Sequence, residues 1–185
     1  SFGTGMAIGD WNADGRADIA AGSPTFNGSR GVMHIFYNDG SMPVSSNDAD
    51  VTITNYYNNS ASFGYVIAAG DFNADGRMDL ITSANSDASA YGQVFVFYND
   101  GSYPSDAVTA DIIEIGEAAN NYFGISLATG DLNTDGKTDF AVGAYGYSSN
   151  TGRAYIITTE AKTTGVWEKA TVRKAVKFRG PVKLR

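Results

Sequence analysis

The stretch "GDWNADGRADIA" at residues 9–20 places oxygen-bearing side chains at every second position around a glycine turn signal. Nearly the same stretch returns as "GDFNADGRMDLI" at 70–81 and as "GDLNTDGKTDFA" at 130–141. Carboxylates held this close together repel one another. Because the chain keeps this repulsive arrangement three times, we expect the charges to have a function. The surrounding sequence indicates which fold carries them.

The three acidic stretches belong to a longer repeat of about 60 residues. Phe-Gly pairs stand at 2–3, 63–64 and 123–124, and each precedes an acidic stretch by the same spacing. Further along, "GVMHIFYNDGS" (31–41) matches "GQVFVFYNDGS" (92–102), and "GRAYIITTE" (152–160) keeps the strand pattern without the turn. Self-similarity at a fixed period indicates a repeat architecture.

Each repeat predicts four β-strands. The first runs from Phe-Gly into the acidic stretch, and the second follows it as "DIAAGS", "DLITSA" or "DFAVGA". The third is rich in β-branched and aromatic residues, and the fourth is "DVTITNY" (50–56) or "DIIEI" (111–115). Asn-Asp-Gly at 38–40 and 99–101 predicts a tight hairpin turn, because glycine supplies the positive φ that such turns need. No run is periodic enough to favour a helix.

A repeating unit of four antiparallel strands is a β-propeller blade, so the sequence predicts an all-β propeller fold. We expect blades at about 1–62, 63–122 and 123–180, the last only if the tail supplies its outer strand. Propellers close with about four to eight blades. Three blades do not make a ring, which predicts that this chain is part of a larger propeller.

Charge divides the chain into two segments. The net charge of −7 combines an acidic segment, 1–160, with a basic tail, 161–185. The tail is interpreted as a degenerate outer strand of the third blade or the start of a neighbouring segment, and no nucleic-acid partner is expected. The chain contains no cysteine, so cysteine usage says nothing about compartment. No apolar run approaches the ~20 residues of a membrane helix, which predicts no membrane insertion.

Each acidic stretch offers oxygen donors at loop positions 1, 3, 5 and 9. In an extended strand these side chains would be too far apart to share an ion. A glycine at position 6 lets the chain curl, and the carbonyl of position 7 can then turn inward. The candidate ligands are Asp10, Asn12, Asp14, Arg16 and Asp18; Asp71, Asn73, Asp75, Arg77 and Asp79; and Asp131, Asn133, Asp135, Lys137 and Asp139.

Hard oxygen ligands of this kind favour Ca²⁺, with about one ion per loop and three in all. Zinc would require His or Cys, and the chain has one histidine and no cysteine. The loops are not EF-hands, because position 12 lacks the bidentate Glu and the flanks predict strands. The alternative is that the aspartates only form turns in solvated loops.

The order of these motifs resembles the FG-GAP repeat. Phe-Gly, "GDxNxDGxxD", the GAP-like residues at 21–24 and 142–145, and a glycine-led aromatic strand follow one another in phase over about 1–160. FG-GAP repeats build the seven-bladed propeller of integrin α subunits and propellers of many bacterial surface proteins. The resemblance implies Ca²⁺ between the first two strands of each blade, held by the twelve Asp and Asn side chains named above.

From this resemblance we expect an extracellular or cell-surface module that binds calcium and recognises a protein or glycan ligand at a loop face. Its other partners are the remaining blades of the same protein. We expect no enzymatic activity, because a catalytic carboxylate pair occurs once in an asymmetric cleft, whereas these clusters repeat. The alternatives are a carbohydrate-binding propeller, which would use Tyr57, Tyr91, Tyr103, Tyr122 or Tyr147, and an accessory propeller of a secreted hydrolase or lyase.

Two further positions predict packing. Trp11, Phe72 and Leu132 stand at loop position 2 and are expected to cover the base of each loop. The single histidine, His34, has Phe95 and Tyr155 as its repeat equivalents, so its position favours a flat ring in the core over a catalytic role.

Overall fold

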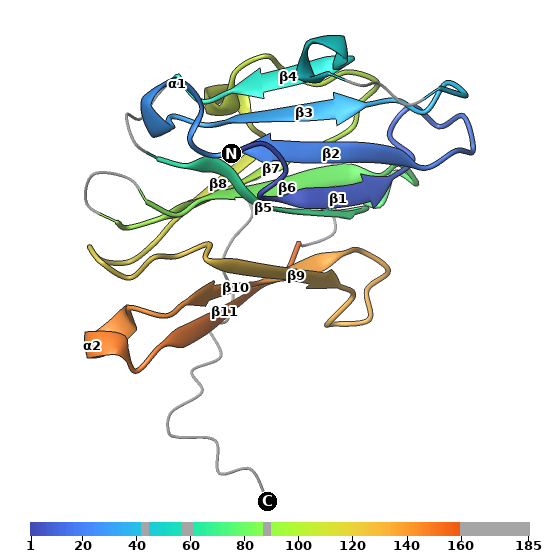
Figure 1. Cartoon of the computed structure of the whole chain (residues 1–185). Coiled ribbons are helices and arrows are strands. Elements are labelled where there is room, and N and C mark those ends of the chain that lie inside the picture. Colours follow the sequence, from blue (N-terminus) through green and yellow to red (C-terminus); the bar gives the residue numbers. More distant parts are fainter. Residues whose placement is uncertain (42–44, 57–60, 87–89, 160–185) are drawn as a thin grey trace, which may run out of the picture.

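Three antiparallel sheets follow one another along the chain and stack face to face in the computed structural model (Figure 1). The structure describes residues 1–41, 45–56, 61–86 and 90–159. Blade 1 contains β1 (Met6–Gly9), β2 (Asp18–Ser23), β3 (Val32–Phe36) and β4 (Val51–Thr54). Blade 2 contains β5 (Phe63–Gly70), β6 (Asp79–Ala84), β7 (Gln93–Phe97) and β8 (Ile112–Ile115). Blade 3 contains β9 (Ser126–Gly130), β10 (Asp139–Ala144) and β11 (Arg153–Ile157).

The strands of each sheet lie in chain order, as the sequence predicts for propeller blades. The first strand of each blade pairs with the second so that a glycine faces the last aspartate of the acidic stretch: Gly9 with Asp18, Gly70 with Asp79, and Gly130 with Asp139. The all-β propeller prediction is confirmed. The predicted outer strand of blade 3 and the basic tail lie outside the described residues.

The predicted tight hairpin at Asn-Asp-Gly is wrong. β3 ends at Phe36 and β4 begins only at Val51, with the short 3₁₀ helix η1 (Ser46–Asp48) between them. Blade 2 repeats this with η2 (Ala107–Thr109). The glycine has the expected positive φ, 108° at Gly40, but it shapes a local turn in which Asn38 Oδ1 accepts the Gly40 N–H.

The other helical turns are short and irregular. α1 (Phe26–Ser29) and α2 (Tyr147–Asn150) occupy equivalent positions, between the second and third strands of blades 1 and 3. Each contains left-handed residues, including Asn27 with φ 48° and Ser148 with φ 49°. They lie at the end of the blades opposite the acidic stretches (Figure 1).

Two hydrophobic clusters form the core, one at each junction between neighbouring blades. At the first junction, Phe63 packs edge-on against Phe95, with ring centroids 5.3 Å apart. At the second junction, Phe72 packs edge-on against Phe140 at 5.8 Å. The blades approach closely, since a Cβ added at Gly22 would collide with the backbone of Gly64. Burial between the blades therefore supplies the main hydrophobic stabilisation of the fold.

Candidate metal centre

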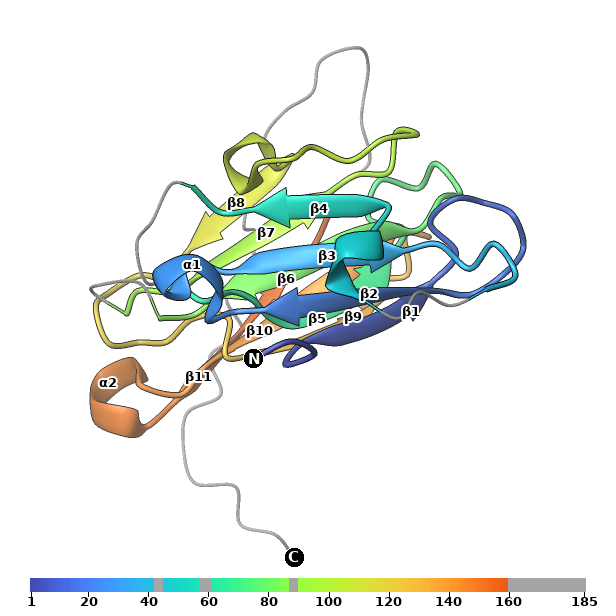
Figure 2. The same cartoon turned by 45° about the horizontal axis from the view of Figure 1, so that its top comes forward.

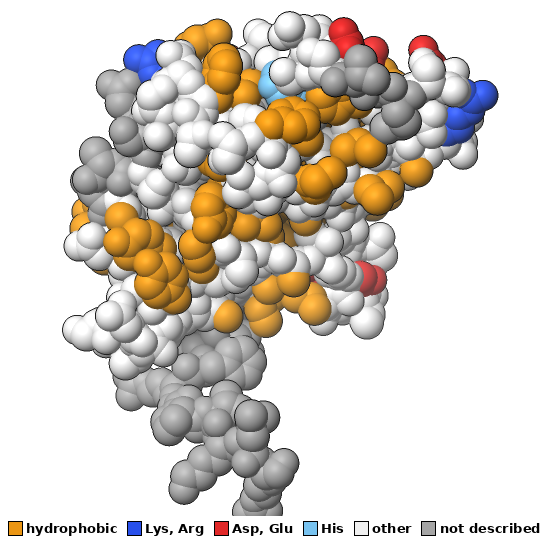
Figure 3. Space-filling model, in the orientation of Figure 1, with side chains coloured by type: hydrophobic (Ala, Val, Ile, Leu, Met, Phe, Trp, Pro, Cys, Tyr) orange, Lys and Arg blue, Asp and Glu red, His pale blue; other side chains and the backbone are white. Residues whose placement is uncertain are grey.

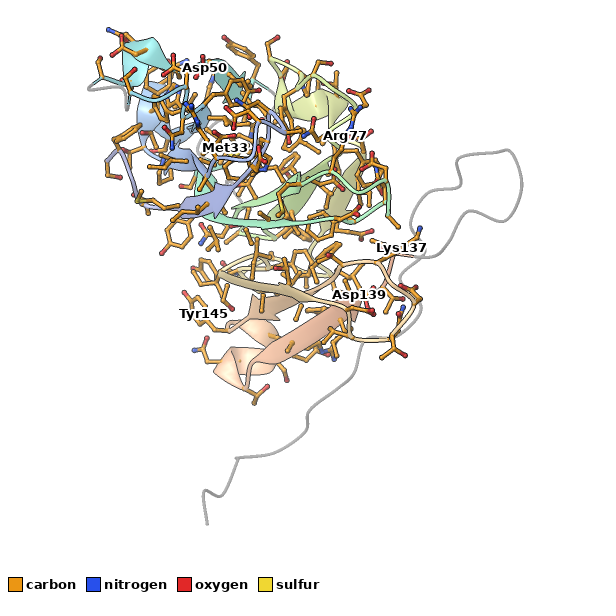
Figure 4. All side chains as sticks on the ribbon, turned by 90° about the vertical axis from the view of Figure 1, so that its right-hand side faces the viewer. Met33, Asp50, Arg77, Lys137, Asp139 and Tyr145 are labelled. Atoms are coloured by element: carbon orange, nitrogen blue, oxygen red, sulfur yellow. The ribbon has the colours of Figure 1, made fainter. Side chains whose placement is uncertain are left out.

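The acidic stretches form three loops, at 10–17, 71–78 and 131–138, between the first two strands of each blade. All three project from the same end of the stacked sheets (Figure 1). Figure 4 looks at this end of the molecule and places Arg77 of blade 2 above Lys137 and Asp139 of blade 3. The candidate ligands of successive blades therefore lie along one rim.

All three loops curl in the same way. Glycine at position 6 has a positive φ in every loop, as predicted, and so does the non-glycine residue at position 4: Ala13 (58°), Ala74 (59°) and Thr134 (62°). A left-handed conformation costs a non-glycine residue roughly 1–2 kcal/mol. Position 4 is a feature that the sequence analysis missed, because nothing about alanine or threonine signals this conformation.

Hydrogen bonds draw the side chains of positions 1, 3 and 5 inward. In the loop of blade 2, the Asp75 N–H lies 3.2 Å from Asp71 Oδ1 and 2.9 Å from Asn73 Oδ1. Asp71 Oδ2 accepts the Gly76 N–H at 2.9 Å, and Asp75 Oδ1 accepts the Arg77 N–H at 2.8 Å. The loops of blades 1 and 3 repeat these bonds. The curl predicted from the sequence is therefore present in all three loops.

The aspartate at position 9 ties each loop to the rest of its blade. Asp79 is fully buried, and its carboxylate accepts the N–H of Phe72 at 2.8 Å and of Asn99 at 2.7 Å. The same pair of bonds occurs at Asp18 and Asp139. Burial raises the pKa of Asp79 to about 6, although the two N–H donors oppose the shift. A buried carboxylate of this kind needs compensation from donors or a cation.

Each loop offers oxygen donors of the kind that a hard divalent cation binds. The acidic side chains of a loop are not, however, already gathered around one position. Within the described residues, no three His, Cys, Asp or Glu side chains gather into a metal-binding group. The asparagine at position 3 adds a further oxygen, because its amide O is also a hard donor. Each carboxylate oxygen has two lone pairs, so the oxygens of Asp71 that accept one N–H each can still coordinate an ion.

Position 7 links the loop to the turn after the third strand. The Arg16 guanidinium lies 3.4 Å from the Asn38 carbonyl oxygen, and Arg77 lies at the same distance from that of Asn99. This places a cationic side chain beside the acidic loop, where it offsets part of the negative charge. The inward carbonyl of position 7 remains a prediction.

Position 2 behaves differently in the last blade. Trp11 and Phe72 are buried at the loop base, as expected, and each packs in the cluster shared with the next blade. Leu132 is 54% exposed, so the packing expected for it is wrong within the described residues. The physical reason is that the side chain at position 2 is covered by the following blade, and no described blade follows blade 3.

The tyrosines that a sugar site would use make contacts within the chain. Tyr103 donates to the Met78 carbonyl at 3.1 Å, Tyr122 stacks on Tyr145 at 4.8 Å, and the Arg153 guanidinium lies 3.3 Å from the ring centre of Tyr147. Tyr91 is partly exposed, and Tyr57 lies outside the described residues. Tyr103, Tyr122 and Tyr147 thus make three different kinds of contact and do not repeat one arrangement from blade to blade.

None of the helices in the described part of the chain has the length and apolar character needed to cross a membrane.

Comparisons with protein families agree with this architecture. A family model described as "FG-GAP-like repeat" matches residues 10–82, and one described as "FG-GAP repeat" matches residues 123–157. The fold and the loops thus define a protein built of propeller blades that each carry one acidic loop. The chain belongs to the FG-GAP repeat proteins.

Similar curated proteins are integrin α subunits. Integrin alpha-PS2 of Drosophila melanogaster is 32% identical over 152 residues, 77% of this chain and 10% of that protein. Integrin alpha-5 of Xenopus laevis is 29% identical over 165 residues, 84% of this chain and 15% of that protein. Integrin alpha-7 of Rattus norvegicus is 39% identical over 90 residues, 46% of this chain and 8% of that protein. The chain thus spans a small part of the length of these relatives, and its blades are of the integrin α type.

Proposed function

We propose that this chain is a calcium-binding, non-enzymatic propeller module that works outside the cell in adhesion or in recognition of a protein ligand. The observation that carries the proposal is the recurrence of one folded loop, with one hydrogen-bond pattern and one oxygen donor set, in three successive blades. The integrin α relatives support the adhesive role.

In this proposal each loop holds one Ca²⁺ through the side chains of positions 1, 3, 5 and 9 and the carbonyl of position 7. Those carbonyls belong to Arg16, Arg77 and Lys137. Hydrogen bonds from the loop backbone turn the oxygens of positions 1 and 3 inward in the loop of blade 2, and the buried carboxylate of position 9 accepts two further N–H groups, which supports this assignment. The ion replaces mutual repulsion of the carboxylates with attraction to a shared positive charge.

The role of the ions is structural. Extracellular calcium modules bind with dissociation constants of roughly 10⁻⁴–10⁻³ M, so millimolar calcium outside cells fills a site at the tight end of this range. A site at about ten times its dissociation constant adds about 1.4 kcal/mol to stability, and three sites add about 4 kcal/mol. This is a large share of the ~5–15 kcal/mol that stabilises a typical domain, and it favours an extracellular location.

A binding role fits the loops better than catalysis. A catalytic carboxylate pair needs two different environments that separate the two pKa values. Here the same environment recurs three times, with a buried aspartate at position 9 of every loop. We therefore propose no enzymatic activity for these loops.

The ligand in this proposal is a protein, held by the loops at the end of the blades that carries α1 and α2. Three of the tyrosines that would serve a glycan ligand, Tyr103, Tyr122 and Tyr147, are engaged within the chain. The described part of the chain is strongly acidic, which disfavours nucleic acid. In this proposal, the remaining blades of the same protein pack on blades 1 and 3 and complete the ring.

Thermal unfolding with calcium, with magnesium and with a chelator tests the calcium part of this proposal. Removing about 4 kcal/mol of binding energy from a chain of this size lowers Tm by about 8–16 °C. Magnesium should restore much less of the loss, because it demands a stricter octahedral site. An unchanged Tm in excess chelator would contradict the proposal.

A further inference from the structure

The acidic loops of blades 2 and 3 are joined to each other by direct hydrogen bonds. The Thr138 N–H of the blade 3 loop donates to the carbonyl of Asp71 at 2.8 Å, and the Asp71 N–H donates to Thr138 Oγ1 at 3.1 Å. The approach is close, because a Cβ added at Gly70 would collide with the side chain of Thr138. Both backbone polar groups of Asp71 are thus bound by one residue of the neighbouring loop.

Both partners of this link belong to proposed calcium sites. Asp71 is position 1 of the blade 2 loop, and its carboxylate accepts the Gly76 N–H. Thr138 is position 8 of the blade 3 loop and stands between two proposed ligands, Lys137 and Asp139, which Figure 4 shows on that loop. Figure 2 shows from a second direction that the loops share one end of the sheets, and Figure 3 shows charged side chains at that end. A movement of either loop therefore displaces the backbone of the other.

A second link joins the loops of blades 1 and 2. The Asn99 side chain donates to the carbonyl of Trp11 at 2.8 Å, and the Asn99 N–H donates to the carboxylate of Asp79 at 2.7 Å. Trp11 is position 2 of the blade 1 loop, and Asp79 is position 9 of the blade 2 loop. Each junction between blades thus connects neighbouring loops, although different residues make the connection.

We propose that the calcium sites of neighbouring blades are coupled, and that Thr138 is the positioning residue that couples the sites of blades 2 and 3. Without an ion, the carboxylates of each loop repel one another and oppose its ordering. The first ion orders its own loop and, through the shared hydrogen bonds, part of the next loop, so the second ion binds a loop that is already partly ordered. The result is positive cooperativity between the two sites. This inference rests on the calcium sites of the proposed function.

Calcium titration of the full chain, followed by NMR with ¹⁵N-labelled glycine, resolves the sites one by one. Gly15, Gly76 and Gly136 each donate their N–H to the position 1 carboxylate of their own loop, so each resonance reports one loop. Asp135→Asn weakens the blade 3 site, and it should also raise the dissociation constant reported by Gly76 at least about threefold, a factor in the range of one hydrogen bond. Asp75→Asn should likewise raise that reported by Gly136, because coupling of binding is reciprocal.

Two threonine variants test whether Thr138 carries the coupling. Thr138→Val removes the acceptor of the Asp71 N–H, and in this background the effect of Asp135→Asn on the blade 2 site should become smaller. Thr129→Val is the matched control, because Thr129 also donates across the same junction, to the Ala69 carbonyl, but from strand β9 and outside the loops. It should leave the coupling unchanged.

The outcomes separate this inference from the calcium binding on which it rests. A Gly76 dissociation constant that Asp135→Asn leaves unchanged, or an equal loss of coupling in the two threonine variants, would overturn the inference while calcium binding stands. If none of the three loop glycines responds to millimolar calcium, the proposed calcium sites fail as well. The Asp135→Asn and Asp75→Asn titrations need neither threonine variant, so they test the coupling even if Thr138→Val does not fold.

Discussion

The middle blade and the first blade contain the same structural positions in different surroundings. Phe63 begins blade 2 and is 0% exposed between two sheets, whereas Phe2 begins blade 1 and is 56% exposed. The acidic loops, in contrast, have the same conformation in all three blades. The loop conformation is therefore determined by contacts within one blade. The burial of a blade's apolar residues is instead determined by the blades that pack on it.

The largest expected effect comes from the aromatic residue that begins each blade. Phe63→Ala removes a ring that packs on Phe95 and Phe97, and it should destabilise the chain by about 3–5 kcal/mol. Phe2→Ala should cost about 0.5 kcal/mol in dilute protein, because the ring is exposed. Urea unfolding of the two variants checks this, and equal losses would break the comparison.

An intermediate effect is expected from a single acidic ligand. Asp75→Asn keeps an oxygen for the Arg77 N–H, but it removes one charge from a proposed calcium site, together with an exposed acceptor of the Asn73 amide that water can replace. It should lower stability by about 1.4 kcal/mol in calcium, or about 3–6 °C in Tm, and by almost nothing in chelator. Asp100→Asn is the control, because Asp100 lies outside the loops in the turn after β7. A loss that persists in chelator would assign Asp75 a role unrelated to the ion.

The smallest expected effect is a difference in stability loss between substitutions at the two blade junctions. Thr138 of blade 3 accepts the Asp71 N–H of blade 2 at 3.1 Å, whereas the equivalent residue of blade 2 is Met78. Thr138→Val should therefore cost about 1 kcal/mol, since it leaves that N–H without its partner. Met78→Leu, which conserves volume, should cost less. Unfolding curves of both variants measure the difference, and the reverse order would rule out a polar link at the second junction.

Much of the fold could be predicted from the sequence because the same sequence patterns recur in all three repeats. The Phe-Gly pairs, the acidic stretches and the aromatic strands fixed the order of strands in each blade, and glycine at position 6 predicted the curl. β5 runs from Phe63 to Gly70, the span that the sequence analysis assigned to the first strand.

The features that could not be predicted depend on contacts that no local sequence pattern indicates. The left-handed Ala13 is held by hydrogen bonds around it, and alanine gives no signal of this conformation. Asn-Asp-Gly predicted a hairpin, but Asn38 instead donates its N–H to Asp18, twenty residues earlier. Leu132 is exposed because no described blade follows blade 3, and the residues around Leu132 give no signal of this.

The central claim is that three like loops hold three calcium ions. Isothermal titration of the metal-free chain with calcium tests it most directly, since it counts the sites and measures their affinity together. We expect about three ions per chain with dissociation constants of roughly 10⁻⁴–10⁻³ M. Absence of heat and of uptake at millimolar calcium would contradict it and leave the aspartates as turn-forming residues.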